Sequence, residues 1–300
     1  MNVTEDGIKD RQLHIEDYLQ MVSAEQKEYA EVSAHQRIAE NNDIITDFQT
    51  NSLMEQILHK DNLNKAYKRV KSNKGAGGVD GMSVDELLGF LKDNQKQLIQ
   101  KIKDGKYKPN PVRRVEIPKE TKGEFRKLGV PTVVDRVFQQ AITQVLSPIY
   151  EKQFSENSFG FRPNRGAHDA LKQCQTNVND GYVYVVDMDL EKFFDTVCQS
   201  KLIEVLSRTI KDGRVISLIH KYLNAGVISR GMFEKTEVGM PQGGPLSPLL
   251  SNIMLNELDK ELARRGHRFV RYADDCMIFC KSKKSAERTL NNIVPYIEGK

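Results

Sequence analysis

The 300-residue sequence contains no long apolar run and few cysteines. No stretch approaches the roughly 18 apolar residues that indicate a transmembrane helix. Met1–Asp6 shows neither the positive region nor the apolar segment of a signal peptide. The four cysteines lack the spacing of a zinc site or of a disulfide framework: Cys174, Cys198, Cys276 and Cys280. We therefore expect a reducing intracellular compartment, the cytoplasm, and no membrane partner.

Two common nucleotide and metal sites are also missing. The glycine-rich segment 75–81 lacks both a Gly-Lys-Ser/Thr ending and a preceding strand, which excludes a Walker-type phosphate loop. The six histidines show no metal-ligand spacing, and the sequence has no internal repeat. These absences argue against a P-loop nucleotidase and against a histidine metal centre.

Charge is distributed unevenly along the chain. Residues 1–52 carry 4 Lys/Arg and 11 Asp/Glu, for a net charge of −7. Residues 53–130 carry 18 and 10, for +8, and residues 131–300 carry 23 and 20, for +3. The middle block predicts a surface for a phosphate backbone, and the alternative is an ordinary helical surface.

Predicted helices and strands follow one another without a regular βαβ rhythm. Residues 1–47 predict one or two weakly amphipathic helices. A helical pattern resumes at Leu53, and Ser83 with Glu86 predicts a capping box at the next helix. The segments 112–119 and 125–131 alternate like the two strands of a basic β-hairpin. This order predicts an α+β fold with an antiparallel sheet.

Acidic side chains stand at the ends of three strand-like runs. Tyr182–Leu190 predicts a buried strand that ends in Asp187 and Asp189. Tyr272-Ala273-Asp274-Asp275 forms a turn between the runs 268–271 and 276–279, with Cys276 and Cys280 expected in the core. Adjacent carboxylates repel, and a hard cation such as Mg²⁺ removes that repulsion. A solvated Asp-Asp turn is the alternative.

These motifs carry a resemblance to a known family. Asp189 with Phe194, then Pro241-Gln242-Gly243, then Tyr272–Asp275 resemble, in order, the three palm motifs of a reverse transcriptase. Phe159-Gly160-Phe161-Arg162-Pro163 is similar to a motif of the group II intron-encoded reverse transcriptases, or maturases. The resemblance runs from about Leu53 to the last residue.

The resemblance implies the fingers and palm of a right-hand polymerase. Its expected parts are a helical N-terminal extension (1–52), fingers (53–130), a first part of the palm (131–199), a connection (200–250) and further palm (251–300). The thumb and C-terminal domains of the family are not present, so we expect a fragment.

The implied activity is RNA-directed DNA synthesis that copies intron RNA into cDNA during retrohoming, together with maturase binding of intron RNA that aids splicing. Alternatives are a retron or diversity-generating reverse transcriptase, or an RNA-binding splicing factor without catalysis. Implied partners are intron RNA, an RNA template with a DNA primer, and deoxynucleoside triphosphates. A homodimer is left open.

The resemblance also implies the site residues. Asp189, Asp274 and Asp275 are the implied catalytic residues, and together with Leu190 they hold two Mg²⁺, with Mn²⁺ as an alternative. Asp187 is left open as a further ligand. The implied substrate contacts are Lys119 and Arg126 to the triphosphate, Phe194 beneath the sugar and Gln242 beneath the templating pair. The basic hairpin adds RNA contacts at Arg113, Arg114 and Lys122.

Overall fold

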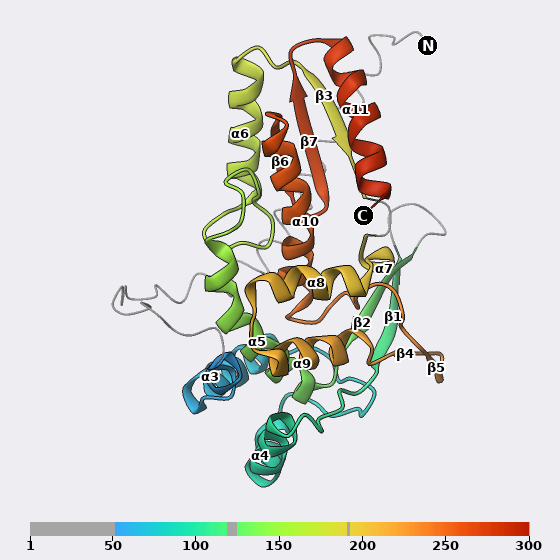
Figure 1. The fold of residues 1–300 in the computed structure, drawn as a ribbon. Helices are drawn as coiled ribbons and strands as arrows, with labels where there is room; N and C mark the ends of the chain where they lie inside the picture. Colours follow the sequence, from blue (N-terminus) through green and yellow to red (C-terminus); the bar gives the residue numbers. More distant parts are fainter. Residues whose placement is uncertain (1–51, 119–124, 191–192, 300) are drawn as a thin grey trace. The chain divides into compact units, whose positions relative to one another are not determined.

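A computed structural model describes residues 52–118, 125–190 and 193–299 (Figure 1). The predicted N-terminal helices, Lys119 and Lys122 lie outside these residues. The helices are α2 (Leu53–Ile57), α3 (Lys60–Ser72), α4 (Leu87–Lys103), α5 (Val133–Glu151), α6 (Ala167–Asn179), α7 (Phe193–Thr196), α8 (Gln199–Thr209), α9 (Gly213–Leu223), α10 (Ser247–Arg264) and α11 (Lys283–Glu298). The strands are β1 (Val112–Pro118), β2 (Phe125–Val130), β3 (Tyr184–Met188), β4 (Val227–Ser229), β5 (Met232–Glu234), β6 (Arg268–Tyr272) and β7 (Asp275–Cys280).

The sheet that carries the acidic motifs has the strand order β3-β7-β6, and both of its strand pairs are antiparallel. The central strand β7 pairs with β3 from Tyr184↔Cys280 to Met188↔Cys276. The predicted α+β class with an antiparallel sheet is therefore confirmed.

One face of this sheet is covered by α10 and α11 (Figure 1). The side chains on that face form an apolar cluster made of Val186, Met188, Leu258, Leu262, Phe269, Cys276, Ile278 and Ile293. Because side chains alternate along a strand, the odd-numbered residues of β3 and β7 point to the other face. There α6 covers β6, and Phe159, Ala170, Val270 and Phe279 pack together.

The prediction of a buried strand at Tyr182–Leu190 holds only for Val186 and Met188. In β3, Tyr184 is 43% exposed and Val185 is 42% exposed. The physical reason is that β3 forms an edge of the sheet. Val186 and Met188 pack into the apolar cluster, whereas Val185 points to the opposite face and Tyr184, at the start of the strand, is not part of that cluster. The predicted positions of Cys276 and Cys280 in the core are confirmed, since both are buried.

A second sheet has the order β2-β1-β4-β5. Its β1–β2 hairpin is the predicted basic hairpin, paired from Arg113↔Val130 to Pro118↔Phe125. The parallel pairing of β1 with β4 was not predicted. The strands β4 and β5 have three residues each, which is too short for an alternating pattern to be recognised.

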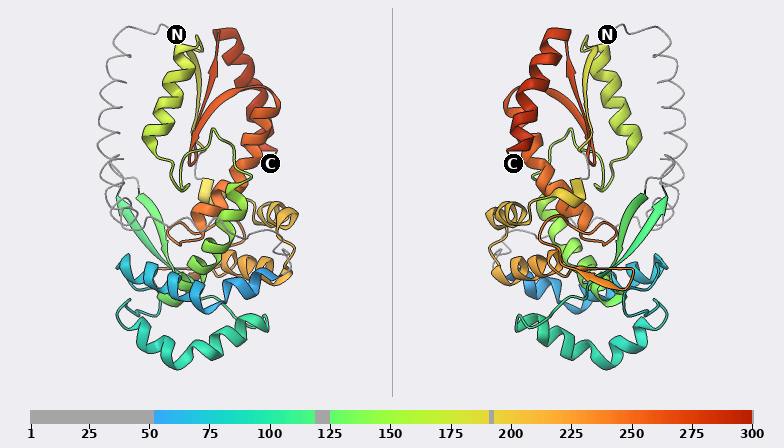
Figure 2. Two further views of the ribbon diagram at one scale, coloured as in Figure 1. Left: turned by 90° about the vertical axis from the view of Figure 1, so that its left-hand side faces the viewer. Right: turned by 90° about the vertical axis from the view of Figure 1, so that its right-hand side faces the viewer.

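The largest apolar core is helical and lies beside this second sheet. The helix α5 packs against α2, α3 and α10, and buries Val137, Phe138 and Ile142 (Figure 2). Its first turn is capped by Thr132, whose hydroxyl accepts a hydrogen bond from the Asp135 amide. No helix among the described residues is both long and apolar enough to span a bilayer.

Candidate active site

The two adjacent carboxylates lie at a tight hairpin between β6 and β7. Tyr272 pairs with Asp275, so Ala273 and Asp274 are the two central residues of the turn. The φ of Ala273 is 56°, whereas Asp274 is not among the described residues with positive φ. Positive φ at the first central residue alone is the pattern of a type II′ turn, which matches the twist of a hairpin.

Asp189 reaches the same end of the sheet from β3. The β3–β7 ladder ends at Met188↔Cys276, and one position further along lie Asp189 and Asp275. Asp187 and Asp189 are exposed and lie on the face opposite Val186 and Met188. The register therefore makes Asp189 and Asp275 neighbours on the face that the helices α10 and α11 leave open.

The acidic residues do not form a closed ligand cage. Among residues 52–118, 125–190 and 193–299, no set of three His, Cys, Asp or Glu side chains lies close enough to hold a metal ion. The carbonyl of Leu190 accepts a hydrogen bond from the amide of Phe193 (3.1 Å), which begins α7. Beneath the carboxylates, burial and the nearby charge of Asp259 raise the pKa of the Cys276 thiol to about 12, so this thiol stays protonated.

The segment Phe159–Pro163 supports the hairpin turn from the side. A Cβ on Gly160 would lie 2.3 Å from the amide nitrogen of Ala273, so only glycine allows this contact. Asn252 of α10 donates to the Gly160 carbonyl (2.8 Å). Arg162 is buried, and it donates to Glu151 (2.6 Å) and to the carbonyl of Ser158 (2.8 Å). Phe159 packs beside the half-buried Tyr272.

The Pro241-Gln242-Gly243 loop and the preceding Met240 connect β2 to α7 through main-chain hydrogen bonds. The Gln242 carbonyl accepts a hydrogen bond from the amide of Gly129 in β2 (2.6 Å). Two residues earlier, the amide of Met240 donates to the carbonyl of Phe194 in α7 (2.7 Å). This loop therefore fixes β2 and the segment after Asp189 to each other.

The predicted substrate residues lie around that loop. Phe194 and Gln242 are both half-buried, and the Phe194 ring meets Phe193 edge-on with ring centroids 5.6 Å apart. Arg126 is exposed on β2, opposite Ile117 of β1. Main-chain hydrogen bonds thus join the loop that carries Gln242 to α7, which carries Phe194, and to β2, which carries Arg126.

The two arginines of β1 differ in their surroundings. Arg113 donates through Nε and Nη2 to the carbonyl of Gly77 (3.1 and 2.8 Å), so it holds the glycine-rich segment 75–81. Arg114 makes no hydrogen bond or ion pair within the described part of the chain. Arg114 is therefore the better placed of the two to contact a phosphate.

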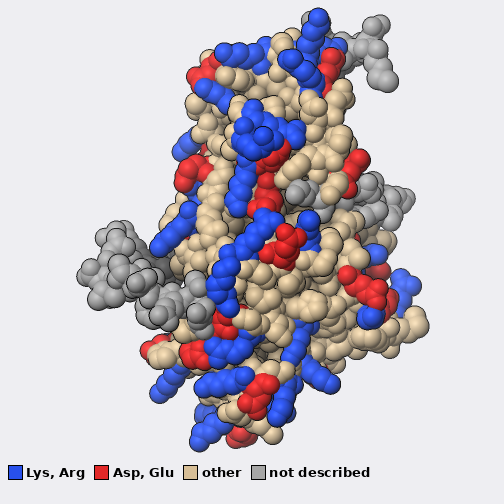
Figure 3. Space-filling view, viewed as in Figure 1, with Lys and Arg blue, Asp and Glu red and all other residues tan. Residues whose placement is uncertain are grey.

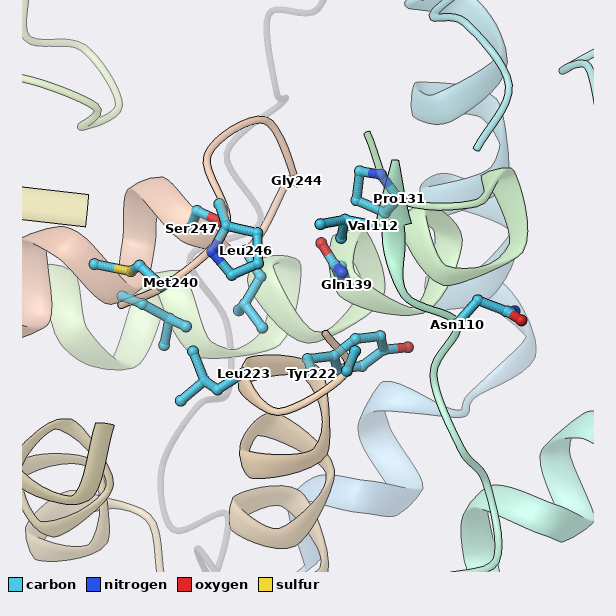
Figure 4. A pocket seen from close by; sticks show the side chains of 13 residues that line it. Asn110, Val112, Pro131, Gln139, Tyr222, Leu223, Met240, Gly244, Leu246 and Ser247 are labelled. Atoms are coloured by element: carbon cyan, nitrogen blue, oxygen red, sulfur yellow. The ribbon is translucent and has the colours of Figure 1, made fainter. Parts of the chain in front are cut away.

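The small cavity behind the glycine loop is not a substrate site. Its lining includes Gln139, Tyr222, Met240, Pro241 and Gly244 (Figure 4). Its volume of about 20 Å³ has room for roughly one water molecule. The cavity is therefore too small to hold a nucleotide.

Sequence reasoning missed a buried ion pair beneath the turn. Arg271 and Asp259 are both 0% exposed, with Nη2 2.6 Å from Oδ2. The signal was available, because Arg271 is a cation within the apolar run Phe269–Tyr272, next to the acidic motif. A charged residue at a strand position that faces the core predicts a buried partner.

The arrangement first defines a class of protein. An antiparallel sheet with carboxylates at a hairpin, joined by a glycine loop to a second sheet with a basic hairpin, is the fingers-and-palm fold of template-directed polymerases. A solved structure titled "Partial Cas6-RT-Cas1--Cas2 complex" shares the fold, with a TM-score of 0.51 and 23% identity. That match covers 88% of this chain and 46% of the other.

The chain belongs to the reverse transcriptase (RNA-dependent DNA polymerase) family, which it matches over residues 117–298. It is 39% identical over 236 residues to the group II intron-encoded protein LtrA of Lactococcus lactis subsp. cremoris. It is also 39% identical over 219 residues to the protein YkfC of Escherichia coli (strain K12). The relation to LtrA confirms the resemblance that the motifs indicated.

The chain spans only part of these relatives. The match with LtrA covers 79% of this chain and 39% of LtrA. The match with YkfC covers 71% of this chain and 57% of YkfC.

Proposed function

We propose that this chain is the fingers and palm of an RNA-directed DNA polymerase of the group II intron type. The observation that carries the proposal is the β3–β7 register, which makes Asp189 and Asp275 neighbours on an open face with Asp274 in the adjoining turn. The reaction is the addition of deoxynucleotides to a DNA primer on an RNA template.

The donor set suits magnesium. Asp189, Asp274 and Asp275 offer carboxylate oxygens, which are the ligands that Mg²⁺ prefers, and the main-chain oxygen of Leu190 adds a fourth donor. Asp187 faces the same side and is available as a further ligand. When bound, two divalent ions activate the attacking oxygen and stabilise the leaving group of an in-line phosphoryl displacement; Mn²⁺ is the natural substitute.

The chain's own residues position the substrates. Arg126 of β2 and Lys119, which the sequence places after β1, bind the triphosphate, where a guanidinium can make paired contacts and an ammonium acts as a point charge. Phe194 lies under the incoming sugar, where a bulky ring excludes a 2′-hydroxyl and selects deoxynucleotides. The main chain of Gln242 is fixed against β2, which holds that residue beneath the templating base pair.

A maturase role in binding intron RNA is supported by the basic block. Residues 53–130 carry a net charge of +8. Lys and Arg side chains lie in the lower part of the molecule, around α3 and α4, and others lie over its middle and upper parts (Figure 3). The neighbouring hairpin adds Arg114 and Lys122. A polyanion such as intron RNA fits this charge. Cytoplasmic location and a homodimer stay predictions from the sequence.

Primer extension on an RNA template tests the polymerase. Asp274→Asn, in this chain or in a longer protein that contains it, should abolish Mg²⁺-dependent cDNA synthesis and leave RNA binding unchanged. The matched control is Asp195→Asn, which removes an exposed carboxylate from α7. Undiminished synthesis by Asp274→Asn, or equal loss of synthesis and RNA binding, would contradict the assignment.

A further inference from the structure

The guanidinium of Arg271 lies directly under the acidic turn and has no contact with solvent. Its Nε and Nη2 donate to the two carboxylate oxygens of Asp259 in α10 (2.7 and 2.6 Å). Such paired contacts are among the strongest hydrogen bonds in proteins. A buried ion pair nevertheless adds little net stability over apolar residues of similar volume, because both charges lose their hydration. Stability alone therefore does not explain this pair.

The remaining donors of Arg271 connect three parts of the chain. Nη1 donates to the carbonyl of Ala273 in the turn (2.7 Å) and to Oδ1 of Asn252 in α10 (3.0 Å). Nη2 also donates to the hydroxyl of Ser158, in the segment before α6 (2.8 Å). Every N–H of the guanidinium thus has a partner, which fixes its orientation.

The carbonyl of Ala273 is a sensitive point of the hairpin. It belongs to the peptide between the two central residues, and the orientation of that peptide distinguishes a type II′ turn from a type I′ turn. The φ of 56° at Ala273 is a conformation that costs free energy for any residue with a Cβ. Such a conformation persists only where its surroundings hold it.

The surroundings hold Ala273 from two sides. Gly160 packs against its amide nitrogen, where a Cβ would lie 2.3 Å away. Arg271 binds its carbonyl from below (2.7 Å). A fixed central peptide also fixes the direction in which the chain enters Asp274 and Asp275.

We infer that Arg271 and Asp259 are positioning residues, which hold the Ala273 peptide so that Asp274 and Asp275 face the metal site. This inference rests on the proposed function for the metal, but its structural part, the fixed turn, can be tested separately. Neither residue touches the substrate.

The test separates positioning from stability with a paired replacement. Arg271→Met with Asp259→Leu removes both charges together, so no unpaired charge stays buried. The Ala273 carbonyl, Asn252 and Ser158 lose a donor, so the melting temperature should fall while the chain still folds. Hydrogen exchange at the amides of Tyr272 and Asp275 should become faster. The affinity for Mn²⁺, measured by electron paramagnetic resonance, should fall about 10- to 100-fold, as for other residues that orient metal ligands.

A suppressor and a control sharpen the test. Adding Ala273→Gly should restore part of the Mn²⁺ affinity, because glycine adopts positive φ without a Cβ penalty and depends less on Arg271. The control Arg208→Met removes an arginine that pairs with Glu204 and Glu257 on the surface. It should change neither the hydrogen exchange at the turn nor the affinity for Mn²⁺.

The outcomes are distinct. If the paired replacement keeps both the slow exchange and the Mn²⁺ affinity, the inference is wrong. If that variant fails to fold, Arg271→Lys replaces it, since lysine keeps the charge near Asp259 but cannot reach all the partners of Arg271. Unchanged hydrogen exchange at Tyr272 and Asp275 in this variant would overturn the inference. If the unsubstituted chain and Asp274→Asn bind Mn²⁺ equally, the proposed metal function fails, and exchange at the turn alone decides on positioning.

Discussion

Phe161 is a bulky residue in a backbone conformation that favours glycine. Its φ is 58°, and its side chain is 53% exposed. Its neighbours hold the main chain there, since the Gly160 carbonyl binds Asn252 and the Arg162 side chain binds Glu151. The backbone of Phe161 is therefore strained directly beside Gly160, the residue that packs against the acidic turn.

We predict that Phe161→Gly is more stable than Phe161→Ala. Both variants lose the ring, so their difference isolates the backbone. Left-handed φ costs a residue with a Cβ about 1–2 kcal/mol, which exceeds the roughly 0.4–1 kcal/mol of unfolded-state entropy that disfavours glycine. Denaturant unfolding should show a difference of about 1 kcal/mol. Equal stabilities, or a more stable Ala variant, would mean that the positive φ carries no strain.

Single residues could be singled out from the sequence where they belong to a motif, but not where their partner is distant in the sequence. The acidic residues of the Tyr272–Asp275 turn are recognisable because adjacent carboxylates need a reason to coexist. The role of Arg271 depends on Asp259 and Ser158, which only the fold brings to it. The hydrogen bond from Arg113 to the Gly77 carbonyl was not predicted, because it depends on the hairpin passing beside the glycine-rich segment, and the expected RNA contact of Arg113 stays a prediction.

At the scale of elements, contacts between main chains join the motifs. The segment with Gly160 touches the β6–β7 turn, and the Gln242 loop touches β2. Gly243 lies against the same strand, where a Cβ would meet the Gly129 carbonyl at 2.8 Å. The glycines of these motifs therefore permit close approach of the elements that carry the candidate site.

We predict opposite effects for two glycine substitutions. Gly160→Ala should lower the melting temperature and reduce Mn²⁺ binding. Its Cβ would lie 2.3 Å from the amide nitrogen of Ala273, so the turn would have to move away. Gly89→Ala should stabilise α4 by about 0.5–1 kcal/mol, since no atom lies within 4 Å of its Cβ and alanine favours helices. Thermal unfolding measures both changes. A Gly160→Ala variant as stable as the parent would contradict the close packing of the turn.

The elements themselves were predicted where their patterns are long. The β1–β2 hairpin was recognisable from the alternation of residues 112–119 and 125–131. The hydrogen bonds expected between Ser83 and Glu86 are present, but Ser83 is not the N-cap, because α4 begins at Leu87 with Glu86 as its N-cap. The exposure of β3 was not predictable, because an apolar strand at a sheet edge has the same composition as a central one. The pairing of β1 with β4 depends on segments more than a hundred residues apart in the sequence.

At the scale of the whole molecule, charge separates two kinds of surface. Residues 53–130 carry a net charge of +8, whereas residues 131–300 carry +3 over a longer stretch. The acidic turn lies in the second part and the basic hairpin in the first. We therefore expect that the proposed binding of a polyanion and the proposed binding of a divalent cation can be changed independently.

We predict that RNA binding depends steeply on salt. Each neutralised phosphate contributes a slope of about −0.7 to −0.9 in log affinity against log salt concentration. Changing Arg114 and Lys122 to Glu should therefore make the slope shallower by roughly 1.5. Arg264→Glu, on α10 outside the basic block, is the control and should leave it unchanged. Fluorescence anisotropy with a structured RNA provides the slopes. An unchanged slope in the hairpin variant would exclude the hairpin as an RNA contact.

The fold class of the whole chain was predictable because helices and strands follow one another in an irregular order. The packing of its elements was not, since the largest core combines helices from α2 to α10 that are distant in sequence. The candidate site was predictable as a set of residues. The arrangement of these residues in space could not be predicted, because it depends on the β3–β7 register, which no sequence pattern specifies.

The central claim, that Asp189, Asp274 and Asp275 hold divalent metal, is tested most directly by anomalous X-ray diffraction from crystals soaked in Mn²⁺. An anomalous peak should lie within about 2.5 Å of carboxylate oxygens from both the β3 end and the β6–β7 turn. The peak should disappear in Asp274→Asn. No peak at these residues, or the same peak in the variant, would contradict the claim.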